Sequence, residues 1–105
     1  SIFMNGQFDR DRVLKKYSFC VYCESRKELT VDHVIPFALR KRFKLSKAQI
    51  NNYGNLVAAC QGCNMEKSGK SLEDFFSKHP DYKRNFLRNA RYVSDIVLSS
   101  LRYSV

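Results

Sequence analysis

The sequence contains no long hydrophobic run, only two prolines and four glycines, and few acidic residues. No apolar stretch approaches the roughly 20 residues of a membrane-spanning helix, which argues against a membrane protein. The scarcity of glycine and proline excludes a collagenous chain. With 105 residues, of which 44% are hydrophobic, the composition is that of one globular domain and is too short for a multi-domain enzyme. The N-terminal SIFMNGQFDRDR lacks the apolar core of a signal peptide, so we expect no secretory signal and a cytoplasmic protein.

The shortage of acidic residues makes the chain strongly basic. Nineteen Lys and Arg stand against ten Asp and Glu, which gives a net charge of +9. A small domain with this charge attracts polyanions, and nucleic acid is the first candidate. A basic surface that serves only solubility is the alternative. An anionic membrane is less favoured, because the basic residues are spread along the chain and form no amphipathic stripe.

The cysteines form two C-x-x-C pairs, Cys20 with Cys23 and Cys60 with Cys63. This spacing is typical of a structural zinc site with four thiolate ligands. Disulfides are the alternative, but the missing signal sequence and the short separation within each pair argue against them. A thioredoxin-type redox site would use one C-x-x-C rather than two matched ones. We therefore expect zinc to close the long loop between the pairs.

Hydrophobic periodicity and capping signals predict a mixed α and β chain. The expected elements are a helix over 8–17, a strand over 28–34 ended by Pro36, a turn of helix over 47–53 capped by Ser46, a turn at Gly54, a strand over 56–59, a helix that starts in 64–70, a helix over 71–78 capped by Ser71, and a last helix over about 82–102 capped by Asp81. The last helix is expected to pack on the domain, although a free helix that awaits a partner is the alternative.

Four polar residues form a candidate catalytic constellation: Asp32, His33, Asn55 and Asn64. Asp32 supplies a hard oxygen ligand for Mg²⁺ or Mn²⁺, and neutral His33 can accept a proton from water. Asn55 offers an amide that can hold the imidazole tautomer. Asn64 offers an amide oxygen as a second ligand, placed by the zinc ligand Cys63 before it. Taken singly each is weak evidence, because an isolated Asp-His pair usually belongs to the surface or the core.

The order of these motifs resembles an HNH endonuclease of the ββα-metal (His-Me finger) superfamily. The resemblance rests on C-x-x-C, LTVDHVIP and NLVAACxxCNxxK, which together cover residues 20–67. It implies an α+β fold in which two antiparallel strands and a helix form a small core, stapled by the four-cysteine zinc site and flanked by helices. One HNH domain spans residues 1–105 in this interpretation, with a helical extension over 71–103.

The resemblance also implies roles for the candidate residues. His33 is the general base, Asp32 and Asn64 hold a catalytic divalent ion, and Asn55 orients the base and shapes the loop. Asn64 stands where the last histidine of the motif often lies, which makes the sequence an H-N-N variant and favours Mg²⁺ or Mn²⁺ over Zn²⁺. Expected nucleic-acid contacts are Lys67 in the motif helix and the basic run Arg40, Lys41, Arg42 and Lys44.

The implied activity is metal-dependent hydrolysis of DNA phosphodiester bonds with one metal ion, which gives 5′-phosphate and 3′-hydroxyl ends. A zinc-stapled nucleic-acid-binding module without catalysis is the first alternative, and a protein-interaction domain is the second. The sequence leaves open whether the domain acts alone, as a homodimer or as part of a larger polypeptide. It leaves the DNA specificity open as well.

Overall fold

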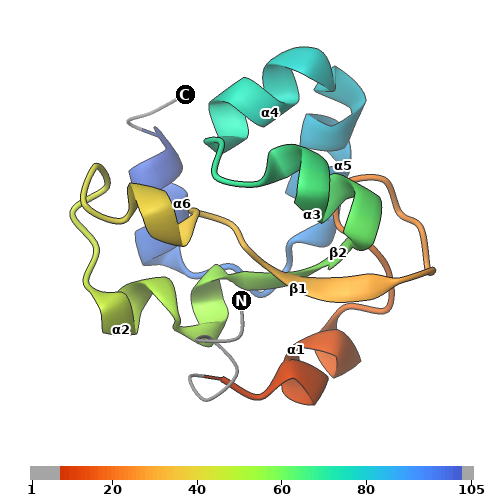
Figure 1. Cartoon of the computed structure of the whole chain (residues 1–105), viewed down its shortest axis with the longest axis horizontal. Helices are drawn as coiled ribbons and strands as arrows, with labels where there is room; N and C mark the ends of the chain where they lie inside the picture. Colours follow the sequence, from red (N-terminus) through yellow and green to blue (C-terminus); the bar gives the residue numbers. More distant parts are fainter. Residues whose placement is uncertain (1–7, 103–105) are drawn as a thin grey trace.

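The computed structural model describes residues 8–102 and shows a small α+β fold around a two-stranded sheet (Figure 1). The elements, in chain order, are α1 (Arg10–Lys16), β1 (Leu29–His33), η2 (Phe37–Leu39), α2 (Lys47–Ile50), η3 (Tyr53–Asn55), β2 (Leu56–Cys60), α3 (Gln61–Lys67), α4 (Leu72–Lys78), α5 (Pro80–Asn89) and α6 (Asp95–Arg102). No helix in this part of the chain is long and apolar enough to cross a membrane.

The two strands pair in antiparallel register from Leu29 opposite Cys60 to His33 opposite Leu56. β2 carries the apolar run LVAAC and is buried through Ala59. Helix α3 follows β2 directly and contacts both strands, while α1 contacts them from the other side of the sheet (Figure 1). The predicted core of two antiparallel strands and a helix is therefore confirmed.

The long connection from β1 to β2 is ordered by local caps. Ser46 forms a capping box with Gln49 at the start of α2, as the sequence predicts. Asn52 caps η3 through a hydrogen bond from the amide of Gly54. The connection returns the chain to the end of β1, where the amide of Val34 donates to the carbonyl of Asn55 at 2.8 Å.

The last helix differs from its prediction. The region expected to form one helix over 82–102 consists of α5 and α6, and α5 begins at Pro80, so the expected cap at Asp81 is wrong. The helix breaks after Ala90, and a contact from outside residues 82–102 holds the chain at this break. Ser94 N donates to the carbonyl of Gly54 at 2.9 Å, and a Cβ on Gly54 would lie only 2.5 Å from the Cβ of Ser94. This close approach requires glycine at position 54 and turns the chain between the helices.

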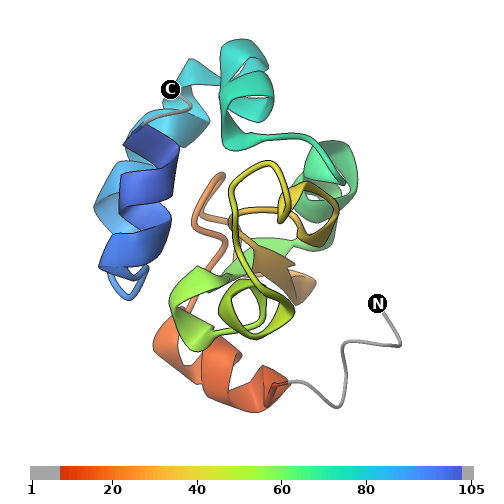
Figure 2. The ribbon, with the colours of Figure 1, turned by 90° about the vertical axis from the view of Figure 1, so that its left-hand side faces the viewer.

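One smaller boundary also differs, and another is as predicted. Helix α3 begins at Gln61, inside the second cysteine pair, because the Cys60 side chain accepts the amide of Cys63 and caps the helix. Helix α4 spans Leu72–Lys78 with Ser71 as its cap, as predicted. Figure 2 shows the C-terminal helices grouped along one side of the sheet, with the connection between α5 and α6 directed toward α1.

Candidate active site and metal centre

The four cysteines converge on one point. Their sulfur atoms all lie within 4.8 Å of one another, and the Sγ atoms of Cys23 and Cys60 are 3.5 Å apart. With Zn–S bonds of about 2.3 Å, the sulfurs of a tetrahedral site lie about 3.8 Å apart. All four are free cysteines rather than disulfides. The arrangement therefore suits a structural zinc ion with no open coordination position.

The local backbone also fits a thiolate site. In each pair the amide of the second cysteine points at the sulfur of the first, at 3.5 Å for Cys23 to Cys20 and 3.4 Å for Cys63 to Cys60. The hydrogen bond between the Cys63 and Cys20 side chains lowers the pKa of Cys20 to about 5 and raises the pKa of Cys63 well above its usual value. The proton of this pair therefore lies on Cys63, and it has to leave when both cysteines bind a metal ion as thiolates.

The second cysteine pair places Asn64 over β1. Asn64 Nδ2 donates to Thr30 Oγ1 at 2.8 Å and to the carbonyl of Val31 at 3.2 Å. Both acceptors belong to β1 and lie within two residues of Asp32, and they fix the amide nitrogen. Among residues 8–102, no hydrogen bond to Asn64 Oδ1 is present, so this oxygen keeps its acceptor capacity.

Asp32 lies under α3 in a buried polar network. Its Oδ2 accepts the hydroxyl of Tyr22 at 2.7 Å, and its Oδ1 accepts the ammonium of Lys67 at 3.2 Å. Lys67 is 0% exposed and also donates to the carbonyl of His33 at 2.6 Å. The expected phosphate contact at Lys67 is therefore corrected: its charge neutralises Asp32 inside the domain and does not reach the surface.

His33 ends β1, and its side chain makes its hydrogen bond outside this network. Its Nε2 lies 2.9 Å from Asn51 Oδ1. Because an amide oxygen only accepts, Nε2 must carry the hydrogen and Nδ1 keeps its lone pair. Burial lowers the pKa of His33 below its usual value, so the ring is neutral near pH 7. No hydrogen bond to Nδ1 is present among residues 8–102, so a neutral imidazole with this tautomer is suited to take a proton from water.

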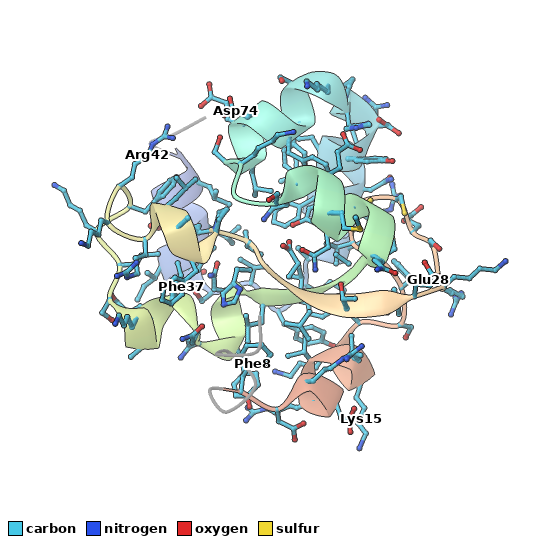
Figure 3. The ribbon with its side chains drawn as sticks, in the orientation of Figure 1. Phe8, Lys15, Glu28, Phe37, Arg42 and Asp74 are labelled. Carbon is cyan, nitrogen blue, oxygen red and sulfur yellow. The ribbon has the colours of Figure 1, made fainter. Side chains whose placement is uncertain are left out.

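Two aromatic rings flank this imidazole. The Phe8 ring lies 6.1 Å from it and the Phe37 ring 6.5 Å, both with edge-to-face geometry, and Figure 3 shows these two phenylalanines on either side of the strand end. The guanidinium of Arg40 stacks over Phe37 at 4.6 Å. The basic run therefore begins next to the imidazole. Its other members, Lys41, Arg42 and Lys44, are exposed.

Asn55 has a different position from the one expected for a partner of the imidazole. It is fully buried, and its side chain accepts the amide of Ile35 and donates to the carbonyls of Ile35 and Ile50. It therefore shapes the loop that follows His33, while Asn51 makes the hydrogen bond to the ring. Sequence reasoning missed Asn51, and its place at the end of α2 beside Asn52 gives no spacing signal that would single it out.

Comparison with known proteins identifies the family of this region. Residues 20–70 match the model of the HNH endonuclease family. This segment is an HNH endonuclease domain. The matched range contains both cysteine pairs, Asp32, His33 and Asn64, and it covers about half of the chain. Neither the curated proteins nor the solved structures give a match. The HNH domain thus connects the zinc site and the imidazole to nuclease chemistry.

Proposed function

We propose that this HNH domain is a metal-dependent DNA endonuclease with His33 as its general base. The observation that supports it best is the fixed tautomer of His33, which leaves Nδ1 free within a segment of HNH sequence. The net charge of +9 supports a polyanionic substrate. The basic run that starts at Arg40 supports the same conclusion, because it adjoins the base through Phe37.

In the proposed reaction, His33 Nδ1 takes the proton of a water molecule as its oxygen attacks phosphorus. The bond from phosphorus to the 3′ oxygen breaks in line, and the 3′ oxygen takes a proton from solvent water, which gives a 5′-phosphate and a 3′-hydroxyl end. Asn51 holds the ring while its charge changes, because Asn51 Oδ1 accepts the hydrogen on Nε2 both before and after the proton transfer. Asn55 has a supporting role through the backbone of Ile35.

Asp32 and Asn64 are the residues that would hold the catalytic divalent ion. Their carboxylate and amide oxygens are the hard donors that Mg²⁺ and Mn²⁺ prefer. Tyr22 and Lys67 use two of the roughly four acceptor positions of the Asp32 carboxylate, so acceptor capacity remains. When bound, such an ion would act as a Lewis acid that stabilises negative charge on the phosphate and on the leaving oxygen.

The test is cleavage of a supercoiled plasmid by zinc-loaded protein in buffer stripped of other divalent ions. We expect no cleavage in that buffer and cleavage once Mg²⁺ or Mn²⁺ is added. Circular dichroism in the same buffers checks that the zinc-held fold is unchanged. If no added ion produces cleavage while the protein still retards the plasmid in a gel, the endonuclease proposal fails and a non-catalytic binding module is supported.

The hydrogen bond from His33 to Asn51 predicts a second effect. Asn51→Leu removes the acceptor, so the imidazole loses its fixed tautomer, and we expect kcat to fall about 10–100-fold, the usual cost of losing such a supporting partner. KM should change little, because Asn51 is not expected to contact DNA. Asn51→Asp keeps an acceptor oxygen at the same place and should retain much more activity. Equal losses in both variants would contradict a role in holding the ring.

A further inference from the structure

A pocket at the end of α1 is not explained by the four-cysteine site or by His33. It has a volume of about 390 Å³ and lies between the end of α1 and the end of α5. Its walls carry three cationic and three aromatic side chains, Lys16, Arg88, Arg91, Tyr17, Phe19 and Tyr92. No carboxylate belongs to its lining. Its chemistry is therefore that of a site for an anion attached to a flat ring.

The aromatic part of the pocket is held in place. Tyr17 is buried, and its hydroxyl accepts the backbone amide of Tyr92 at 3.1 Å. The Tyr92 ring meets the Tyr17 ring edge to face with centroids 5.4 Å apart, yet Tyr92 remains 48% exposed. A large aromatic ring that is fixed at one edge and open on its face can stack on a base at low entropic cost.

The three cationic side chains of the pocket differ in whether an acidic side chain already compensates their charge. Arg88 donates to the carboxylate of Glu24 at 2.9 Å, so its charge is already compensated. Lys16 and Arg91 are exposed, and neither forms an ion pair within residues 8–102. The ammonium of Lys16 lies 5.6 Å from the centre of the Tyr92 ring. These two residues therefore supply the positive charge that a phosphate could neutralise.

A series of contacts connects this pocket to the candidate active site along α1. Phe8 packs against His33, and the guanidinium of Arg12 stacks over Tyr53 at 3.8 Å. Lys16 lies between Tyr53 and Tyr92, at 5.8 Å and 5.6 Å from their ring centres. From Arg10 to Lys16 the helix α1 rises about 9 Å, which matches about three nucleotides of one DNA strand at about 3.4 Å each.

We propose that this pocket binds an unpaired nucleotide of a nucleic-acid strand, with its base on Tyr92 and its phosphate between Lys16 and Arg91. The proposal rests on the proposed function in that the same strand would continue along α1 toward His33. A paired base has its faces covered by its neighbours, so the pocket favours single-stranded or locally unpaired substrates over a continuous duplex. Asp9 and Asp11 lie at the opposite end of α1, away from the pocket.

The test measures binding of a labelled 15-nucleotide oligo-dT and of a duplex of the same length to the zinc-loaded full chain. Fluorescence anisotropy without added Mg²⁺ or Mn²⁺ separates binding from cleavage. The pocket variant is Lys16→Gln with Arg91→Gln. The matched control is Lys15→Gln with Arg84→Gln, which removes the same amount of charge from α1 and α5 at residues outside the pocket.

We expect the pocket variant to bind the single strand at least tenfold more weakly, and the control variant to lose less than threefold. The slope of log affinity against log salt should flatten by about 0.7 in the pocket variant, for the one phosphate that lies between the two cations on a single strand. Tyr92→Leu should weaken single-strand binding about tenfold and leave duplex binding nearly unchanged, whereas Tyr92→Phe should bind like wild type.

Equal losses in the two double variants would overturn the proposal, because the binding would then depend on overall charge. An unchanged affinity of Tyr92→Leu would overturn it as well, because no base would stack on the ring. The plasmid assay is independent of these measurements. A protein that cleaves DNA but shows neither binding effect would support the endonuclease function and contradict the pocket proposal. A protein that shows both binding effects but does not cleave DNA would support the pocket proposal and contradict the endonuclease function.

Discussion

Replacing His33 with alanine is expected to abolish plasmid cleavage while zinc content and DNA affinity are retained. The variant removes the free Nδ1 to which the proposed reaction transfers a proton, and loss of a general base usually lowers the rate about 10²–10⁴-fold. The measurement is the rate of conversion of supercoiled plasmid to nicked or linear forms with Mg²⁺ or Mn²⁺. The ratio of nicked to linear product also tests for a dimer, because one active site cuts one strand.

His79→Ala is the matched control, because His79 is the only other histidine in the sequence. Its ring pairs with Glu66 and stacks on Tyr82 with centroids 4.2 Å apart, away from the imidazole of His33. We expect this variant to keep cleavage within a few-fold of wild type. Cleavage by His33→Ala at the wild-type rate, or an equal loss in both variants, would remove His33 from the role of base.

The parts of the fold that follow from the sequence are those fixed by local signals. The two cysteine pairs predict the metal site, and the β-branched and apolar runs at 28–34 and 56–59 predict the two strands that the structure pairs. Serine caps at positions 46 and 71 locate the starts of two helices. Each serine cap directly precedes its helix, and the two cysteines of each pair lie three residues apart, so these signals are local in the sequence.

The parts that do not follow depend on contacts between distant segments. The apolar residues of 82–102 keep a helical spacing across the break between α5 and α6. Val93 and Val97 are both buried, although a turn separates α5 from α6. The break itself depends on Gly54, about 40 residues earlier in the sequence. A helical period therefore could not show where the helix ends.

In the candidate site, too, local signals predict some features, and contacts between distant segments determine the others. The identities of Asp32 and His33 follow from the motif, but the alternation of strand side chains gives them different surroundings. Lys67 has the spacing of a surface helix residue, yet it is buried because Asp32 needs a counter-ion beneath α3. An isolated buried carboxylate would be costly, and only the packing of α3 on β1 shows that this one exists.

Replacing Cys60 with serine is expected to release zinc and unfold the domain. Structural zinc contributes about 10–16 kcal/mol in small zinc-binding peptides, which is comparable with or larger than the whole stability of a domain of this size, about 5–15 kcal/mol. Serine can still cap α3, since its hydroxyl can accept the amide that Cys60 Sγ now accepts from Cys63. The variant therefore removes a metal ligand without removing the helix cap.

The measurements are zinc content per chain and the thermal transition followed by circular dichroism. Met65→Ser is the matched control, because it introduces serine into the same helix at a side chain that is 71% exposed and holds no zinc. We expect the control to keep one zinc per chain and a melting temperature within a few degrees of wild type. A Cys60→Ser protein that is folded, free of zinc and as thermally stable as this control would show that the four sulfurs converge without a structural metal, and the fold would then depend on its apolar core alone.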